Sequence, residues 1–241
     1  MSQIKSFAFL PRRPDISAEQ FHRHWSTIHR AHALRITTLR RYVQLHRTQE
    51  ALPGFAPSIY DGVPEVWLDS LEDALALATD PNYVEYAAKD EPNFIDMDRM
   101  TGLVTVEDVQ LEGPPVGRDT SLVKGLLLVK LGAGVDERDF RAWWHDRFGE
   151  LVQKEVPNLA RYVQCTPDAA AYQDAGPPYD GVAELWWSDT ARFRQAAGGL
   201  ERLAAALGDA PVDLDGTVSL VGEELRVIWP DGPGATRDSW S

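Results

Sequence analysis

The sequence predicts an α+β fold in which two ferredoxin-like repeats, each of order β-α-β-β-α-β, pack their antiparallel sheets face to face and form one barrel within a single chain. The main observation is an internal duplication, because three short blocks recur in the same order, 119 or 120 residues apart. They are FHRHW and FRAWW (from Phe21 and Phe140), RYVQ (from Arg41 and Arg161) and YDGV (from Tyr60 and Tyr179). The second observation is the order of strand-like and helix-like segments around these blocks, which is the same in both halves and typical of ferredoxin-like units.

The strands of each half are expected where β-branched and aromatic residues form short apolar runs. These runs are residues 4–10, 40–46, 60–68 and 102–111 in the first half, and residues 122–131, 160–165, 179–187 and 216–228 in the second. A sheet with both helices on one face leaves its other face uncovered, and a second copy of the same unit is the natural cover. We therefore expect the barrel to close within one chain, around a central cavity.

The helices are expected between these runs. The first begins near Asp15 or Ser17, with Gln20 in its first turn, where capping groups favour a helix start. The next helix of the first half is expected over residues 70–90, interrupted by Pro81.

The duplication sets the domain boundaries. The repeats span residues 1–111 and 122–229, and a linker rich in proline and glycine, residues 112–121, joins them. Residues 230–241 are expected to be a disordered tail.

Composition limits the class of function. A formal net charge of −13, with no strong cluster of Lys and Arg, argues against nucleic-acid binding. No apolar run has the length of a membrane span, and the first residues do not form a signal peptide. The single cysteine, Cys165, fits a reducing compartment, so a cytoplasmic protein is expected. The expected partner is a small molecule, and a homodimer of the duplicated chain stays open.

Strand alternation predicts which side chains line the barrel. The expected interior residues are Tyr42, Gln44, His46, Asp61, Glu65 and Trp67 in the first half, and Tyr162, Gln164, Glu184 and Trp186 in the second. Val43 and Leu45 would then face the helices. Burial would raise the pKa of Glu65 and Glu184 unless a cation lies nearby, although both could simply accept hydrogen bonds within the barrel.

The histidines are the sharper signal, because five of the six lie between residues 22 and 46. Projected as a regular α-helix, Trp25, Ile28 and His32 share one stripe, His29 lies at its edge, and His22 and His24 point to solvent. The positions that match His29, His32 and His46 in the second half hold Phe148, Leu151 and Thr166. The first half is therefore expected to carry the site, since histidine is well suited to proton transfer near neutral pH.

A metal site is the competing use of these histidines. His29 and His32, with His46 or Glu65, could supply ligands, but the longer His-Glu-x-x-His pattern is missing. We expect neither a metal nor a cofactor.

The repeated blocks resemble the EthD-domain family of the dimeric α/β-barrel superfamily. The family pattern is a helical Phe-x-x-x-Trp-x-x-x-His, then Arg-Tyr-Val-Gln-x-His, then Tyr-Asp-Gly-x-x-Glu-x-Trp. The first half matches all three, through Phe21, Trp25 and His29, residues 41–46 and residues 60–67, whereas the second half lacks both histidines. The resemblance implies a barrel of two ferredoxin-like halves. It also implies relatives that include dehydratases and isomerases of small ring compounds, within a superfamily that holds cofactor-free oxygenases, polyketide cyclases and haem enzymes.

The leading hypothesis is a cofactor-independent acid/base enzyme, of the lyase, isomerase or cofactor-free oxygenase type. Its substrate would be a small, largely apolar compound with a carbonyl or hydroxyl group, held in the barrel cavity. His29 or His46 would transfer the proton, Glu65 and Asp61 would orient the imidazole, and Tyr42 would hydrogen-bond the substrate oxygen. The substrate-binding residues would be Gln44, Trp67, His32, Tyr162, Gln164, Glu184 and Trp186.

Two alternatives remain from other classes. One is a non-catalytic protein that binds a small molecule as an accessory of a degradation pathway. The other is a haem- or metal-dependent oxidoreductase.

Overall fold

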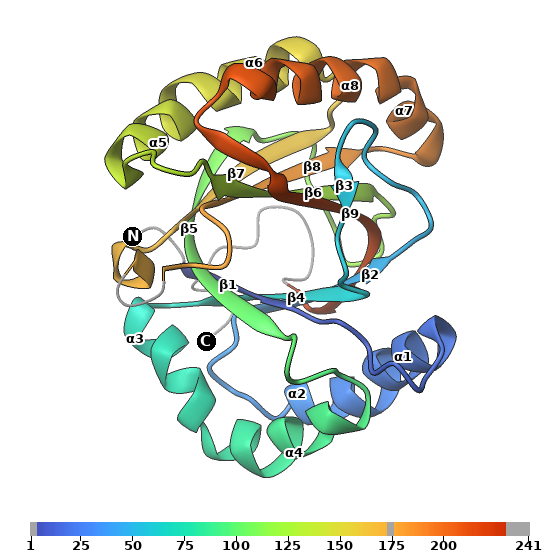
Figure 1. Ribbon diagram of the computed structural model, residues 1–241. Helices are drawn as coiled ribbons and strands as arrows, with labels where there is room; N and C mark the ends of the chain where they lie inside the picture. Colours follow the sequence, from blue (N-terminus) through green and yellow to red (C-terminus); the bar gives the residue numbers. More distant parts are fainter. Residues whose placement is uncertain (1–3, 173–175, 230–241) are drawn as a thin grey trace.

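A closed barrel of eight antiparallel strands lies between two layers of helices (Figure 1). This computed structural model describes residues 4–172 and 176–229, so the expected tail at residues 230–241 lies outside the described residues. Around the barrel the strands follow the order β2-β4-β1-β5-β7-β8-β6-β9 and return to β2. They are β1 (Ile4–Phe9), β2 (Arg41–Arg47), β4 (Gly62–Leu68), β5 (Thr101–Leu111), β6 (Val123–Leu131), β7 (Arg161–Pro167), β8 (Gly181–Trp187) and β9 (Val212–Ile228). A short strand, β3 (Ala56–Pro57), adds in parallel to β9. The predicted α+β fold is confirmed.

The two helical layers come from the two halves of the chain. The first layer contains α1 (Ala18–His24), η1 (Trp25–His29), α2 (Arg30–Ala33), α3 (Leu71–Ala76), η2 (Leu77–Thr79), η3 (Tyr83–Ala87), α4 (Ala88–Asp90) and η4 (Glu91–Asn93). The second contains α5 (Glu137–Trp143), η5 (Trp144–Phe148), α6 (Gly149–Glu155), α7 (Thr190–Gln195), α8 (Ala197–Ala206) and η7 (Leu207–Asp209), and η6 (Ala169–Tyr172) lies in the loop after β7. Ser17 caps α1 in a capping box with Gln20, as the sequence indicates. The helix expected over residues 70–90 is broken before Pro81, also as expected.

Two long strands join the halves into one barrel. β5 pairs with β1 of its own half through Thr101–Val106, and with β7 of the other half through residues 105–111. β9 likewise pairs with β6 through residues 212–223 and with β2 through residues 222–228. The expected closure within a single chain is confirmed, and each half supplies one strand that the other half needs.

The prediction of which residues face the barrel was right for β4 and β8 and wrong for β2 and β7. In the register of β2 with β4, Tyr42 lies opposite Val66 and Val43 lies opposite Glu65. Val43 and Leu45 therefore point into the barrel, while Tyr42, Gln44 and His46 point toward the helices. Tyr162 and Gln164 do the same in β7, where Val163 lies opposite Glu184. On this face Gln44 and Gln164 donate hydrogen bonds to carbonyl groups of the helices.

The centre of the barrel is filled by a cluster of four buried charged side chains, Lys5, Glu65, Lys124 and Glu184, which we call the central ion cluster. Each ammonium lies between 2.5 and 2.8 Å from both carboxylates. Burial lowers the pKa of Lys5, but Glu184, Glu65 and Glu107 together raise it well above its ordinary value, so the ammonium stays charged. The four side chains thus occupy the barrel centre, where the sequence placed the substrate cavity.

Two tryptophans cover the central ion cluster. The Nζ atoms of Lys5 and Lys124 lie 4.2 and 4.4 Å from the ring centroids of Trp67 and Trp186. An ammonium over an indole face is attracted by the ring quadrupole, more strongly when it is shielded from water. Trp67 and Trp186, expected to bind substrate, thus complete the packing around buried charges.

The first helix of each half contains one π-helical turn, η1 and η5. A π turn adds one residue to a helical turn, so residues after it are rotated by about 100° relative to a regular α-helix. His29 consequently faces the sheet and is only 8% exposed, whereas Ile28, expected there, is 51% exposed. His32 is displaced in the same way and stacks on Tyr86 at the helix surface.

The repeated sequence blocks hold this π turn against the sheet. The Gln44 Nε2 group donates to the Trp25 carbonyl at 3.0 Å, and Gln164 donates to the Trp144 carbonyl at 2.8 Å. Gly62 makes room for the Trp25 ring, since a Cβ at residue 62 would lie 2.3 Å from it. The Trp, Gln and Gly of the three blocks are thus parts of one packing unit.

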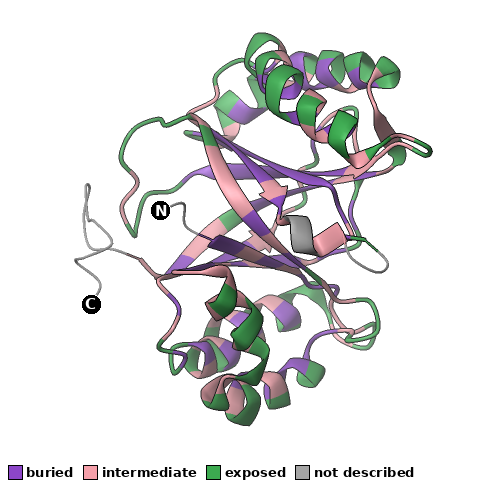
Figure 2. Cartoon of the chain, turned by 90° about the vertical axis from the view of Figure 1, so that its left-hand side faces the viewer, coloured by how far each residue is buried: buried purple, intermediate pink, exposed green. Residues whose placement is uncertain are grey.

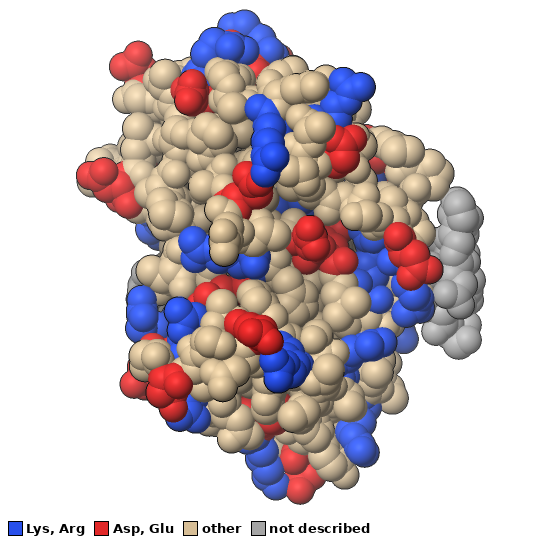
Figure 3. Space-filling model, turned by 90° about the vertical axis from the view of Figure 1, so that its right-hand side faces the viewer, with Lys and Arg blue, Asp and Glu red and all other residues tan. Residues whose placement is uncertain are grey.

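Burial follows the layers, with the barrel strands largely buried and the outer helix faces exposed (Figure 2). On the face shown in Figure 3, acidic and basic side chains are interspersed. Across residues 4–172 and 176–229, no helix has both the length and the apolar character that a membrane crossing requires.

We expect Lys5→Met to lower the free energy of unfolding by about 3–5 kcal/mol, because two buried carboxylates would share one ammonium. The matched control is Lys89→Met, which removes an exposed ion pair with Glu85 and should change stability by less than about 1 kcal/mol. Urea unfolding followed by tryptophan fluorescence measures both. Equal, small losses in the two variants would show that the central ion cluster does not hold the barrel together.

Candidate active site

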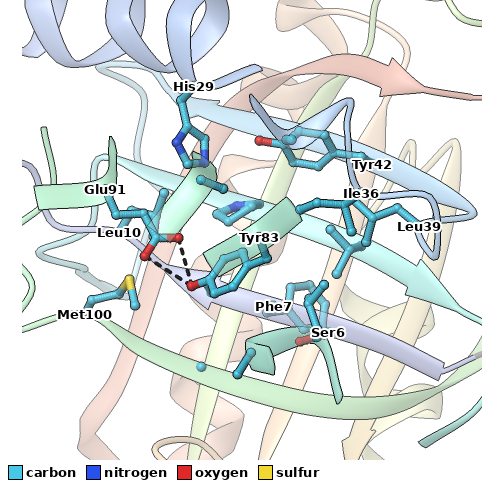
Figure 4. A pocket seen from close by; sticks show the side chains of 18 of the residues that line it. Ser6, Phe7, Leu10, His29, Ile36, Leu39, Tyr42, Tyr83, Glu91 and Met100 are labelled. Carbon is cyan, nitrogen blue, oxygen red and sulfur yellow. Dashed lines mark hydrogen bonds between the residues drawn. The ribbon is translucent and has the colours of Figure 1, made fainter. Parts of the chain in front are cut away.

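A pocket of about 320 Å³ lies outside the barrel, between the sheet and the helices of the first half (Figure 4). Its floor is the outer face of β1, β2, β4 and β5, and its roof is formed by the helices from η1 to η4 and the loops that follow α2 and η4. Most of the wall is apolar, from residues such as Phe7, Leu10, Trp25, Ile36, Leu39, Val66, Leu77, Ile95 and Met100. The polar side chains in the wall include His29, Tyr42, Tyr83 and Glu91. Such an apolar hollow with few polar groups is the usual form of a small-molecule site.

His29 is held in one orientation by Asp90. Its Nδ1 atom lies 3.1 Å from an Asp90 oxygen. Asp90 also accepts hydrogen bonds from His24 and Asn93. Burial opposes ionisation of Asp90, but the hydrogen bonds from these three residues outweigh it and hold the pKa of the carboxyl well below its ordinary value. A fixed carboxylate at Nδ1 makes that nitrogen the donor, which leaves Nε2 as the basic atom of a neutral imidazole.

Tyr42 supplies a hydroxyl group to the same pocket. Its oxygen accepts hydrogen bonds from Trp25 Nε1 at 3.2 Å and from Gln44 Nε2 at 2.8 Å. Burial raises the pKa of Tyr42 to about 12, so the hydroxyl keeps its hydrogen near neutral pH. Because the Tyr42 oxygen already accepts two hydrogen bonds, its hydroxyl group can interact with a ligand as a hydrogen-bond donor.

Glu91 and Tyr83 form a second polar pair in the wall. The Tyr83 hydroxyl lies 3.0 and 3.1 Å from the two carboxyl oxygens of Glu91 and donates a hydrogen bond that they share. Burial raises the pKa of Glu91, against the opposing effects of His29 and the Tyr83 hydrogen bond. In Figure 4, Glu91 lies on the same side of the pocket as His29, with Tyr83 below it and Tyr42 across from them.

The matching space in the second half is filled by side chains. Phe148 stands where the first half has His29, is fully buried, and stacks on Trp144 with ring centroids 4.5 Å apart. Phe193, Leu200 and Leu203 pack into the same core. At this pair of positions, only the first half therefore has an imidazole that can transfer a proton.

The structure separates the residues expected to form one site into three groups. His29 and Tyr42 line the pocket. Glu65, Trp67, Glu184 and Trp186 lie in the barrel interior, around the central ion cluster. The remaining residues lie elsewhere on the outer sheet face, the helices or the loops: His46, Asp61, Gln44, His32, Tyr162 and Gln164.

Asp61 has a structural position. Its carboxylate accepts the Arg12 backbone N–H at 3.1 Å and contacts the Arg12 guanidinium. Asp180 makes the equivalent contact to the Leu131 backbone in the second half. The expectation that Asp61 and Glu65 orient a histidine is wrong, since Asp90 does this for His29.

His46 is engaged at both ring nitrogens. Its Nε2 lies 3.1 Å from Gln44 Oε1, so it donates there, and its Nδ1 accepts from His22 Nδ1 at 2.9 Å. The Trp25 ring packs against it, with centroids 4.5 Å apart, and itself forms part of the pocket wall. His22, expected in solvent, is thus a hydrogen-bond partner, and His46 has no nitrogen left for a substrate.

Sequence reasoning missed Asp90, Glu91, Tyr83, Lys5 and Lys124. A signal existed for Lys5 and Lys124, because the offset of 119 residues that aligns the repeated blocks also aligns these two residues. The pairing of Asp90 with His29 depends on the π turn and had no local signal.

The residues do not fit a metal ion. Among the described residues, Glu107, Cys165 and Glu184 form the one group with suitably spaced donor atoms. Both carboxylates already contact the Lys5 ammonium, at 3.4 and 2.6 Å. Burial and the neighbouring Glu184 raise the pKa of the Cys165 thiol well above its ordinary value. A protonated thiol beside an ammonium is the opposite of what a cation requires.

The fold defines a protein of the dimeric α/β-barrel class in which one chain supplies both halves. Solved structures with this fold include candidate monooxygenases from Fusobacterium nucleatum (TM-score 0.56, 6% identity, 97% of this chain and 96% of that one) and from Lactobacillus acidophilus (TM-score 0.50, 8% identity, 94% and 95%). A chlorite dismutase mutant from Candidatus Nitrospira defluvii in complex with cyanide is also similar (TM-score 0.51, 10% identity, 94% and 92%).

The sequence places the chain in a family. The family model described as the EthD domain matches residues 13–98 and again residues 132–214. The chain therefore belongs to the EthD-domain family, as a tandem duplication. No curated protein matches it significantly in sequence.

We expect His46 to make stability depend on pH. Burial and His22 lower its folded-state pKa to about 3, whereas an unfolded histidine titrates near 6.5. The contribution is therefore fully present above about pH 6.5 and is lost as the pH falls toward 3. His46→Thr, which introduces the residue found at Thr166, should lose less stability between pH 7 and pH 4.5 than the unchanged protein. Urea unfolding at the two pH values measures this, and identical losses would contradict a neutral buried His46.

Proposed function

We propose that the chain is a cofactor-independent enzyme that moves a proton on a small, largely apolar compound with a carbonyl or hydroxyl group. The observation that carries this proposal is the His29–Asp90 pair in the wall of the apolar pocket, with the Tyr42 hydroxyl across from it. Names of structural neighbours carry no reaction over, because at 6–10% identity they share the fold alone.

His29 acts as the base in this proposal. Its Nε2 takes a proton from a carbon next to the substrate carbonyl, and the resulting imidazolium is stabilised by the Asp90 carboxylate bound to Nδ1. Tyr42 donates its O–H hydrogen bond to the carbonyl oxygen as negative charge develops there. The apolar wall excludes water, which strengthens both interactions.

The substrate follows from the size and lining of the pocket. A volume of about 320 Å³ lies at the small end of ligand sites, so it suits a compound of one or two rings. Lyase, isomerase and oxygenase reactions can all begin with the same proton abstraction. The buried thiol of Cys165 fits a reducing compartment, and we assign the reaction to the cytoplasm.

The test uses 2-tetralone, a two-ring ketone with exchangeable hydrogens beside its carbonyl. We expect the protein to catalyse exchange of these hydrogens in D₂O, followed by proton NMR. His29→Gln should slow the exchange about 100-fold or more, the scale for losing a positioned base. Asp90→Asn should also slow it, because an amide at Nδ1 permits the wrong tautomer.

The matched control is His46→Gln, the same substitution at a histidine outside the pocket, which should leave the exchange rate within about twofold of the unchanged protein. No exchange above the uncatalysed rate would contradict proton abstraction and favour a binding protein that only holds its ligand. A visible haem band in the purified protein, lost in His29→Gln, would instead assign His29 as an axial ligand.

A further inference from the structure

We propose that Glu91 is the second proton-transfer group of this pocket: a neutral carboxylic acid that protonates the substrate oxygen while His29 removes the proton from carbon. This inference rests on the proposed function and completes it. It makes the reaction an enolisation, in which one residue accepts a proton and another gives one.

The position of Glu91 is the first support. Its side chain lines the pocket together with His29, and the residue is only 8% exposed. Glu91 makes no ion pair with any Lys or Arg that the structure describes. A buried carboxyl group with no cation beside it is more stable as the neutral acid. A neutral carboxylic acid in an apolar site is an effective donor to a developing enolate oxygen.

Four titratable groups surround Glu91, and they couple its proton to the state of His29. Tyr83 donates to it, Tyr42 lies across the pocket, and Asp90 is the preceding residue. Asp90 raises the pKa of Glu91, whereas a charged His29 lowers it. Burial and the Asp90 charge therefore favour the protonated form of Glu91, and an imidazolium at His29 disfavours it. When His29 becomes an imidazolium, the charge makes Glu91 more acidic at the moment when the substrate oxygen needs a proton.

The step balances without an oxidant or reductant. The C–H bond beside the carbonyl breaks, its proton goes to His29 Nε2, and its electron pair forms the C=C bond. The π pair of the C=O bond takes the proton of the Glu91 carboxyl, which gives the enol and leaves Glu91 as a carboxylate. Return of a proton to carbon from His29, and of the enol proton to Glu91, restores both residues.

The difference between the halves is the second, independent support. The short helix before the last strand of each half is η4 (Glu91–Asn93) in the first half and η7 (Leu207–Asp209) in the second, and the position that matches His29 is Phe148. In the second half η7 contributes the buried Leu207 to the core that fills the matching space, and Phe148 belongs to the same core. The carboxyl group and the imidazole thus occur together in the half that has the pocket, whereas Lys5 and Lys124 occur in both halves.

The experiment measures two quantities for Glu91→Gln, namely exchange of 2-tetralone hydrogens in D₂O and the pH dependence of 2-tetralone binding, followed by tryptophan fluorescence. We expect exchange to fall about 100-fold while binding at pH 6 persists, because the amide still donates a hydrogen bond. In the unchanged protein, affinity should fall as the pH rises through the raised pKa of Glu91, since the carboxylate no longer donates. In Glu91→Gln this dependence should vanish.

Three further variants separate this inference from the proposed function. Glu85→Gln makes the same change at an exposed glutamate of the same helical segment, paired with Lys89, and should alter neither quantity. His29→Gln should stop exchange but keep the pH dependence of binding. Tyr83→Phe removes a hydrogen bond that lowers the pKa of Glu91, so it should move the midpoint of the binding curve to higher pH.

Each outcome of these experiments supports or overturns either the role of Glu91 or the proposed function. Unchanged exchange in Glu91→Gln, or the same pH dependence of binding in Glu91→Gln as in the unchanged protein, overturns the role of Glu91 even if His29→Gln is inactive. Unchanged exchange in His29→Gln overturns the proposed function instead. Failure of 2-tetralone to bind the unchanged protein overturns both, because the pocket is assigned to such ketones.

Discussion

Two ammonium groups and two carboxylates meet at the centre of the barrel, and their mutual pairing occupies the inner face of the sheet. Lys5, Glu65, Lys124 and Glu184 come from four different strands, so the charges balance only when both halves are in register. Removing these charges from water is costly, and only the close geometry of all four compensates for it. These side chains fill the centre of the barrel. The candidate pocket lies on the other face of the sheet, under the helices.

The outer face becomes a site through one irregular turn. A regular helix would have placed Ile28 and His32 against the sheet, but the π turn places His29 there, beside Asp90. The turn is fixed from the sheet side by Gln44, and the Trp25 ring it orients needs the missing side chain of Gly62. The second half keeps the same turn with Trp144, Gln164 and Gly181. The turn therefore belongs to the scaffold, and the residue at its end determines whether chemistry is added.

The sequence was sufficient for the fold because the evidence for it is repeated. Two copies of the same three blocks give the topology and the closure of the barrel, and Ser17 and Pro81 mark where helices begin and break. The faces of β2 and β7 could not be predicted, since alternation alone does not say whether Tyr42 and Gln44 meet water, a barrel or a helix carbonyl. Of the residues expected in the site, His29 and Tyr42 line the pocket. Asp90 and Glu91 were missed because residues 70–90 have the pattern of an ordinary amphipathic helix. Only the π turn places His29 beside the C-terminal end of that segment.

The comparison of the halves explains why one scaffold can carry a site on one side only. The central ion cluster and the Trp–Gln–Gly packing unit draw on both copies, so the barrel closes in the same way with either His29 or Phe148 at the end of the π turn. In the second half, Phe148 packs with Phe193, Leu200 and Leu203, and the burial of apolar surface stabilises that half. His29 buries less apolar surface than a phenylalanine would. The pocket beside it is lined by an imidazole, a phenol and a carboxyl group that a ligand can contact. Because the second half fills the matching space with its core and both long strands cross between the halves, the first half can keep a hollow without losing its register.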